Sequence, residues 1–209
     1  MYIPLTFFIA VSAAFYFYAL FNNLTKWKYI LKPGTTLLIL MLVVVNLDQA
    51  GIYGWLICLA LIFSIIGDIL LMLPSDRFIQ GLISFFIAHV VYVVAFPEFH
   101  EISGYSITVA ILLILCTIVF ALSIIPAVRR EGGMLLIIAV LAYMGIITLM
   151  VYKAVISGEI ILILGAISFY ISDAILAWNR FIKTYPLGEF MLMFTYFLAQ
   201  TFIAYSAIV

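Results

Sequence analysis

The chain has 209 residues, of which 68% are hydrophobic and 9% charged, and its nine Lys and Arg balance nine Asp and Glu. Soluble domains are ordinarily about 45–50% apolar and about 25% charged, so this composition indicates a protein whose solvent is lipid. A zero net charge also excludes the basic footprint that is typical of nucleic-acid binding.

Apolar runs between polar breaks predict an all-α, polytopic membrane bundle of about eight transmembrane helices, since each spanning helix needs roughly 20 apolar residues. Prolines mark the breaks and are expected at helix edges, where the missing N–H is least costly. These prolines are Pro33, within Lys32-Pro33-Gly34, and Pro74, Pro97, Pro126 and Pro186. The predicted spans are residues 3–22, 34–48, 53–73, 78–96, 105–125, 133–152, 159–178 and 188–208. The whole chain, residues 1–209, is predicted to be a single integral membrane domain.

The basic residues predict how the chain is oriented, because Lys and Arg are retained on the cytoplasmic side of short loops. The loops after odd-numbered spans carry Lys26, Lys28, Lys32, Arg77, Arg129, Arg130, Arg180 and Lys183. The opposite loops carry Lys153 with Asp48, Glu98, Glu101 and Glu159. Both termini are therefore expected to face away from the cytoplasm. The brevity of the chain favours a bacterial inner membrane.

Short matching motifs predict that a four-helix unit has been duplicated. Gly67-Asp68-Ile69-Leu70 near the end of the third span matches Ser172-Asp173-Ala174-Ile175-Leu176 near the end of the seventh, and an Arg-Phe pair follows each motif. Residues 85–89 similarly match residues 196–200. The two halves would be residues 1–104 and 105–209. Because four is even, both halves would point the same way, as in parallel-repeat transporters.

Asp68, His89 and Asp173 lie within apolar spans, where ionisable groups are costly and usually functional. Each acid lies about five residues before the end of its helix, roughly 7 Å below the interface. A twofold arrangement of the halves would bring both carboxyls to one site, where one stays protonated and the other ionised near neutrality. Alternatively, each carboxyl pairs locally, for example with Arg77 or Arg180.

His89 is expected to act as a hydrogen-bonded orienting group and not as a metal ligand. Catalytic zinc normally takes three protein ligands, and the other histidine, His100, falls in a loop on the opposite side. Cys58 and Cys116 lie in apolar runs and are expected to be buried thiols. No metal or cofactor is therefore predicted, and the nucleophilic motifs G-x-S-x-G and S-x-x-K are absent.

Further polar residues are candidates for binding a substrate. A polar pocket inside the bundle would be lined by Asn46, Ser64, Tyr170, Tyr196 and Gln200, each of which could instead make only packing hydrogen bonds. Tyr92, one turn beyond His89, is a further candidate, and either of the two could position water or a carboxyl. Three cations, Lys32, Arg77 and Arg180, are expected at the cytoplasmic rim. They could bind the phosphate of a lipid substrate or simply reach out to the phosphates of the surrounding membrane.

Three motifs, in order along the chain, resemble the signature of the YhhN family of membrane proteins. They are Lys32-Pro33; then residues 67–73 with Phe78, Gly81 and Ser84-Phe85-Phe86-Ile87-Ala88-His89-Val90-Val91-Tyr92; and then residues 172–177 with Arg180-Phe181. That family includes lysoplasmalogenases, membrane enzymes that hydrolyse the vinyl ether bond of lysoplasmalogens to a fatty aldehyde and a glycerophospho head group. The resemblance implies an ether hydrolase with a lysophospholipid substrate and with Asp68 and Asp173 as its catalytic pair.

A vinyl ether is cleaved by protonating its β-carbon, after which water adds to the resulting cation. A protonated carboxyl and an ionised partner suffice for this chemistry, as in paired-carboxylate glycoside hydrolysis. The main alternative is a small transporter or lipid carrier that uses the intramembrane acids as a proton relay. A purely structural membrane subunit would leave two acids at matching depth unexplained.

Overall fold

The computed structural model describes residues 2–75, 77–97 and 104–208, and these ranges contain helices and no strand. The helices are α1 (Tyr2–Phe21), α2 (Thr25–Val44), α3 (Leu47–Met72), α4 (Phe78–Ala95), α5 (Gly104–Ser157), α6 (Ile160–Phe181) and α7 (Gly188–Ser206). Six of them, all except α7, are long and apolar enough to cross a membrane. The prediction of an all-α membrane bundle is thus confirmed, and the chain is an integral, multi-pass membrane protein.

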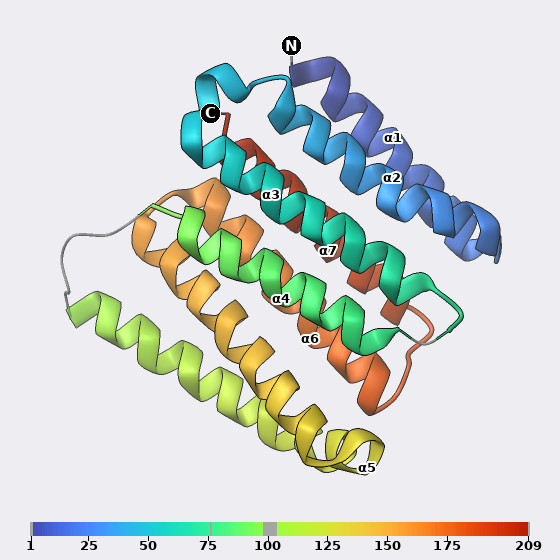
Figure 1. Ribbon diagram of the computed structural model, residues 1–209, viewed down its shortest axis with the longest axis vertical. Coiled ribbons are helices and arrows are strands. Elements are labelled where there is room, and N and C mark those ends of the chain that lie inside the picture. Colours follow the sequence, from blue (N-terminus) through green and yellow to red (C-terminus); the bar gives the residue numbers. More distant parts are fainter. Residues whose placement is uncertain (1, 76, 98–103, 209) are drawn as a thin grey trace.

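Helix α5 consists of two helical arms that meet at a glycine pair, where the chain reverses direction (Figure 1). Gly133 has φ +63° and ψ −153°, a conformation that is essentially restricted to glycine, and Gly132 is also non-helical. Figure 1 shows the two arms of α5 lying side by side after this turn. The predicted spans 105–125 and 133–152 fall on the two arms. The count of eight crossings, like the duplication of a four-helix unit, stays a prediction.

Two prolines that were predicted at helix edges lie inside helices. Pro33 is within α2, so this helix begins at Thr25 and not at residue 34, and Pro126 is within α5. Losing one N–H at Pro33 leaves only the carbonyl of Tyr29 without its helical donor, and Tyr29 lies on an exposed part of the helix. Asn46, predicted inside the second span, instead follows the end of α2.

Helices α3, α4, α6 and α7 form the centre of the bundle, with α1 and α2 along one side and the arms of α5 along the other (Figure 1). Close approach of α3 and α4 depends on glycine. A Cβ atom on Gly67 would lie 2.6 Å from the ring of Phe85, and one on Gly81 would lie 2.6 Å from the side chain of Leu71. This tight contact lies beside Asp68 and fixes its helix against α4.

The outer faces of the bundle are apolar, as a lipid-facing surface must be. Phe7 in α1 is 65% exposed and Leu122 in the first arm of α5 is 67% exposed, whereas soluble proteins rarely expose continuous apolar surface. Cys58 is buried, but Cys116 is exposed on the first arm of α5, so the expectation of two buried thiols is wrong for Cys116. The first arm packs with one face only, and Cys116 lies on its outer side.

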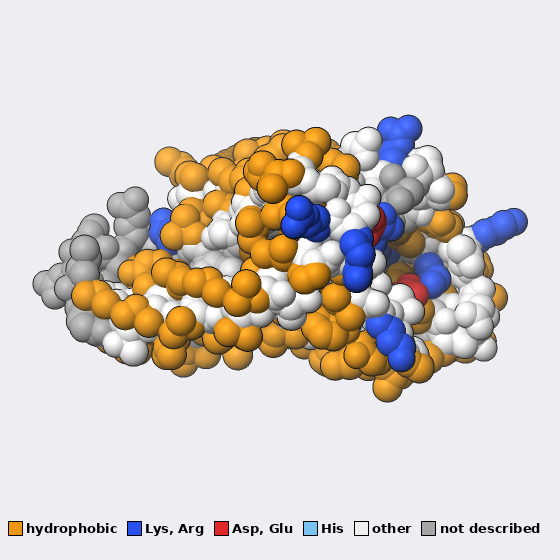
Figure 2. Space-filling model, turned by 90° about the horizontal axis from the view of Figure 1, so that it is seen from below, with side chains coloured by type: hydrophobic (Ala, Val, Ile, Leu, Met, Phe, Trp, Pro, Cys, Tyr) orange, Lys and Arg blue, Asp and Glu red, His pale blue; other side chains and the backbone are white. Residues whose placement is uncertain are grey.

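The two ends of the bundle differ in charge. Both termini lie at the same end (Figure 1), and Figure 2 shows Lys and Arg side chains gathered toward one end of the face that it draws. Lys153 donates a hydrogen bond to the carbonyl of Val93, 2.9 Å away. Three residues used in the sequence predictions lie outside the described residues: Glu98 and Glu101, which bear on orientation, and His100, which bears on metal binding.

Candidate active site

Asp68 is fully buried in α3 and is surrounded by donors from two neighbouring helices. Its Oδ2 atom accepts hydrogen bonds from the hydroxyls of Thr36 in α2 and Tyr196 in α7, each at 2.8 Å. Its Oδ1 atom lies 3.3 Å from the ammonium nitrogen of Lys32. A buried carboxylate needs a cation and several donors. This environment suits an ionised Asp68.

A chain of buried hydrogen bonds leads away from Asp68 through α7 to α4. The Gln200 amide donates to the Tyr196 hydroxyl at 3.3 Å, and the Tyr92 hydroxyl donates to the Gln200 Oε1 atom at 2.6 Å. The spacing of Tyr196 and Gln200 by one helical turn puts both side chains on the same face of α7. Three of the residues predicted to bind a substrate, Tyr92, Tyr196 and Gln200, therefore belong to one hydrogen-bond network that ends at Asp68.

Asp173 in α6 has a different environment, with one hydroxyl and one imidazole beside the same oxygen. The Tyr143 hydroxyl donates to Asp173 Oδ2 at 2.5 Å, and His89 Nε2 lies 3.6 Å from that atom. His89 Nδ1 lies 2.6 Å from the carbonyl oxygen of Phe85. Because a carbonyl only accepts, Nδ1 carries a proton.

The contact between His89 and Asp173 is favourable only if one proton lies between them. A neutral imidazole with its proton on Nδ1 directs the lone pair of Nε2 toward the carboxyl group, where an ionised carboxylate would repel it. Either the carboxyl is protonated or the imidazolium faces a carboxylate. In both cases the His89–Asp173 pair carries one extra proton. Asp68, which faces the ammonium group of Lys32, carries none.

The two acids border one small cavity. It offers about 20 Å³ to the centre of a water molecule, and a cavity holds a water once this volume exceeds about 10–15 Å³. Asp68, Asp173 and Lys32 supply polar atoms to its wall. Sequence motifs over a hundred positions apart are thus brought to one site with room for a single water.

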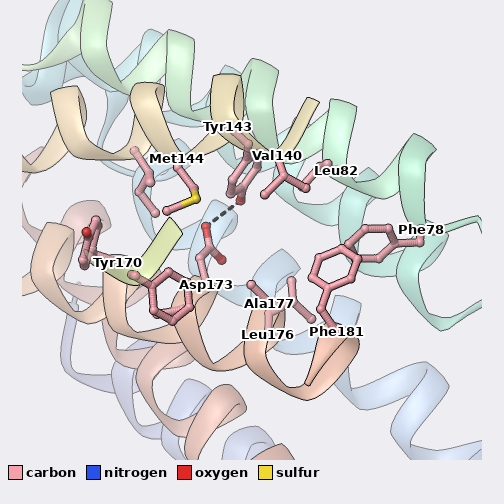
Figure 3. A pocket seen from close by; sticks show the side chains of 13 residues that line it. Phe78, Leu82, Val140, Tyr143, Met144, Tyr170, Asp173, Leu176, Ala177 and Phe181 are labelled. Atoms are coloured by element: carbon pink, nitrogen blue, oxygen red, sulfur yellow. Dashed lines mark hydrogen bonds between the residues drawn. The ribbon is translucent and has the colours of Figure 1, made fainter. Parts of the chain in front are cut away.

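Asp173 also lies in the wall of a larger, apolar pocket between α4, α5 and α6 (Figure 3). This pocket offers about 40 Å³ to the centres of water molecules, about twice the volume of the small cavity. Its lining is apolar apart from Asp173, Tyr143 and Tyr170. In Figure 3 the Asp173 oxygen that Tyr143 does not bind points into the ring of lining side chains. Asp173 and Leu176 line both this pocket and the small cavity.

The remaining predicted residues lie farther from the acids. Tyr170 lines the apolar pocket, where its hydroxyl lies 2.8 Å from Thr117 Oγ1. Arg77 is exposed, with its Nε donating to Ser75 Oγ at 3.2 Å. The structure does not bring Asn46 to this site, because its amide donates to the carbonyl of Leu42 at 2.7 Å near the opposite end of α2.

Arg180 and Lys32 have anionic partners that the sequence did not predict. Arg180 lies at the rim, 2.6 Å from a carboxylate oxygen of Glu131. Lys32, predicted at the rim, is instead buried beside Asp68. Local pairing would have placed Arg77 or Arg180 beside Asp68, but the cation found there is Lys32.

Thr36 and Tyr143, which bind the two carboxyls, were not predicted. Thr36 follows Lys32 by one helical turn, a signal that became visible only once the helix was known to run through Pro33. Tyr143 has no such signal in its own segment. Within the described part of the chain, no three His, Cys, Asp or Glu side chains gather as a metal ion would require.

Comparison with known proteins places this geometry in a family. Residues 27–207 match the model of the YhhN family. Lysoplasmalogenase TMEM86B of Rattus norvegicus is 28% identical over 201 residues, covering 96% of this chain and 82% of the relative. The Mus musculus protein of the same name is 30% identical over 185 residues, covering 88% and 76%. No solved structure matches the chain. The chain belongs to the YhhN family of membrane proteins.

Proposed function

We propose that this protein is a lysoplasmalogenase, a hydrolase that cleaves the vinyl ether bond of a lysophospholipid by two-carboxylate acid–base catalysis. The observation that carries the proposal is the pair of acids, fully buried Asp68 and slightly exposed Asp173, that border one water-sized cavity in different surroundings. The names of the rat and mouse relatives support the reaction. The apolar lining of the pocket beside Asp173 matches the chemistry of the hydrocarbon chain of such a lipid.

In this proposal Asp173 is the acid. Its Oδ2 atom is engaged by Tyr143 and His89, whereas Oδ1 faces the apolar pocket, so the proton that the His89–Asp173 pair holds passes to Oδ1 and is delivered from there to the β-carbon of the vinyl ether. The π-bond supplies the electron pair for the new C–H bond, and the adjacent carbon and oxygen share the positive charge. The Asp173 carboxylate that remains stabilises this cation.

Asp68 is the base that completes the reaction. A water in the small cavity adds to the cationic carbon while a carboxylate accepts its proton, which gives a hemiacetal. The hemiacetal then breaks its bond to the glycerol oxygen, which takes up a proton as the aldehyde forms. Substrate and one water thus give a fatty aldehyde and a glycerophospho alcohol. Lys32, Thr36 and Tyr196 keep Asp68 oriented toward the cavity.

The gathering of basic side chains at one end supports an orientation for the site. Positive residues are retained on the cytoplasmic side of short loops, so the basic end would face the cytoplasm and both termini would face away from it. The lysolipid would then enter from the cytoplasmic leaflet. Residence in a bacterial inner membrane stays a prediction.

The test compares three matched variants of the purified protein on a vinyl ether lysolipid and on its ester counterpart. Asp68→Asn and Asp173→Asn should each lower aldehyde release by roughly 10²–10⁴-fold, the usual contribution of a general acid or base. Asp48→Asn, an exposed acid at the far end of α3, is the control and should retain activity. Full activity in both test variants would refute the mechanism, and fatty acid released from the ester would indicate a lysophospholipase instead.

The alternative of a transporter or lipid carrier stays a prediction, and the same preparation separates it from hydrolysis. A carrier would move the lysolipid across reconstituted vesicles without forming aldehyde. A hydrolase would form aldehyde in detergent, where there is no second compartment to which lipid could move.

A further inference from the structure

A second polar site lies in a groove next to the apolar pocket, where the turn of α5 meets the end of α6. The Arg180 guanidinium lies 2.6 Å from Glu131 Oε1, and each side chain is about one-third exposed (33% and 36%). The guanidinium also lies over the Phe78 ring, 4.8 Å from its centre. Glu131 immediately precedes Gly132 and Gly133, so the glycine turn holds this acid beside α6.

This ion pair borders a groove that adjoins the apolar pocket. The groove offers about 700 Å³ to the centres of water molecules, and Phe78 and Leu82 line both it and the apolar pocket. The other rim ion pair, between Lys28 and Glu189, is arranged differently. Glu189 lines a pocket that shares no residue with the apolar pocket. Of these two ion pairs in the described part of the chain, the Glu131–Arg180 pair is thus the one whose groove shares lining residues with the apolar pocket, whereas the pocket beside Glu189 shares Leu192 with the small cavity.

We propose that Glu131 and Arg180 form a head-group subsite for zwitterionic phosphodiesters, in which Arg180 binds the phosphate and Glu131 binds the ammonium group. The inference rests on the proposed function. A guanidinium binds phosphate oxygens in a fork geometry, and a carboxylate is the natural partner of an ammonium group. When a zwitterionic ligand binds, its phosphate replaces Glu131 as the partner of Arg180, and its ammonium group replaces Arg180 as the partner of Glu131. Neither side chain is then left unpaired.

The spacing along α6 agrees with the length of such a substrate. Arg180 lies two turns beyond Asp173, nearly on the same face and about 10 Å along the helix axis. The bonds from the β-carbon of a vinyl ether to the phosphorus of a glycerophosphate span little more than two residues of extended chain, about 8 Å. A lipid whose vinyl ether lies at Asp173 would thus bring its phosphate within reach of Arg180.

The subsite also disfavours anionic head groups. A phosphodiester without an ammonium group would take Arg180 from Glu131 and leave that carboxylate unpaired beside the phosphate, where like charges repel. Selectivity of this kind arises from a repulsive element as much as from an attractive one. Glu131 is therefore a specificity-determining residue, and Arg180 binds both classes of lipid.

The experiment measures kcat/KM for two vinyl ether lysolipids that differ only in their head group, ethanolamine or uncharged glycerol. Glu131→Gln should lower the ratio of the two values by roughly fivefold, the effect of one partly exposed ion pair. Arg180→Gln should lower both values and change the ratio less, and Glu189→Gln is the control. Because both lipids are assayed on one preparation, the ratio does not depend on the fraction of folded protein.

A binding measurement separates this inference from the proposed function. The saturated ether analogues of the two lipids lack the reacting double bond, and their dissociation constants can be measured on the wild-type protein and on Glu131→Gln. If vinyl ethers are not cleaved but the variant loses the binding preference, the subsite is supported and the function is refuted. Cleavage with an unchanged kcat/KM ratio and an unchanged binding preference would overturn the subsite alone. If there is neither cleavage nor a preference, both are refuted.

Discussion

The ion pair between Lys32 and Asp68 should be among the most stabilising contacts in the bundle, measured by the cost of removing one partner. Only 11% of the Lys32 side chain and none of the Asp68 side chain is exposed. Lys32→Met would leave an uncompensated carboxylate in the core, which costs about 3–5 kcal/mol in comparable buried pairs. For a chain of this length, a loss of about 3 kcal/mol corresponds to a fall in Tm of roughly 6–12 °C.

The matched control is the equivalent substitution one turn earlier in the same helix. Lys28 pairs with Glu189 at 2.8 Å, but their side chains are 19% and 47% exposed, and such pairs contribute about 0–1 kcal/mol. Thermal unfolding in one detergent should therefore separate Lys32→Met clearly from Lys28→Met. Each variant would be compared with the wild-type protein at the same detergent concentration.

A double substitution tests whether the cost arises from the unpaired charge. Once Asp68 is replaced by Asn, no carboxylate remains to be stranded, so adding Lys32→Met should cost about 1–3 kcal/mol less than it does in the wild-type background. An unpaired buried charge is ruled out as the cause if Lys32→Met costs no more than Lys28→Met. It is equally ruled out if the two substitutions at the buried pair are additive.

Three further predictions follow from individual contacts. Tyr143→Phe removes the hydrogen bond to the acid and should lower kcat/KM for aldehyde release about 10-fold or more, whereas Tyr152→Phe on the same arm of α5 should not. Gly67→Ala places a Cβ atom 2.6 Å from the Phe85 ring and should lower the free energy of unfolding by about 1–3 kcal/mol, which denaturation would measure. Ala177→Phe should fill the apolar pocket and reduce lysolipid binding without changing the helical content seen by circular dichroism.

The sequence predicted the class of fold and the acids of the site because both depend on local signals. Long apolar runs indicate membrane helices wherever they occur, and Asp68 and Asp173 are conspicuous within such runs. The spacing of Tyr196 and Gln200 by one turn predicted their common face. None of these inferences requires knowing which helices are neighbours.

The partners of the acids could not be predicted in the same way, because they depend on packing between helices. Reading Pro33 as a break put Lys32 in a loop, whereas the continuous helix turns Lys32 inward beside Asp68. Tyr143 meets Asp173 only because the second arm of α5 folds back against α6. In membrane helices, neighbouring groups compensate the hydrogen bond that a proline loses, so proline is a weaker sign of a helix end than in soluble proteins.

The isotope content of the aldehyde shows whether cleavage begins by protonation of carbon. The purified protein would cleave a vinyl ether lysolipid in deuterium oxide, with the aldehyde reduced at once to its alcohol and a control aldehyde used to correct for exchange. We expect one deuterium on the carbon next to the former carbonyl, and almost no product from Asp173→Asn. Aldehyde without deuterium at that carbon would contradict protonation by Asp173 and the mechanism built on it.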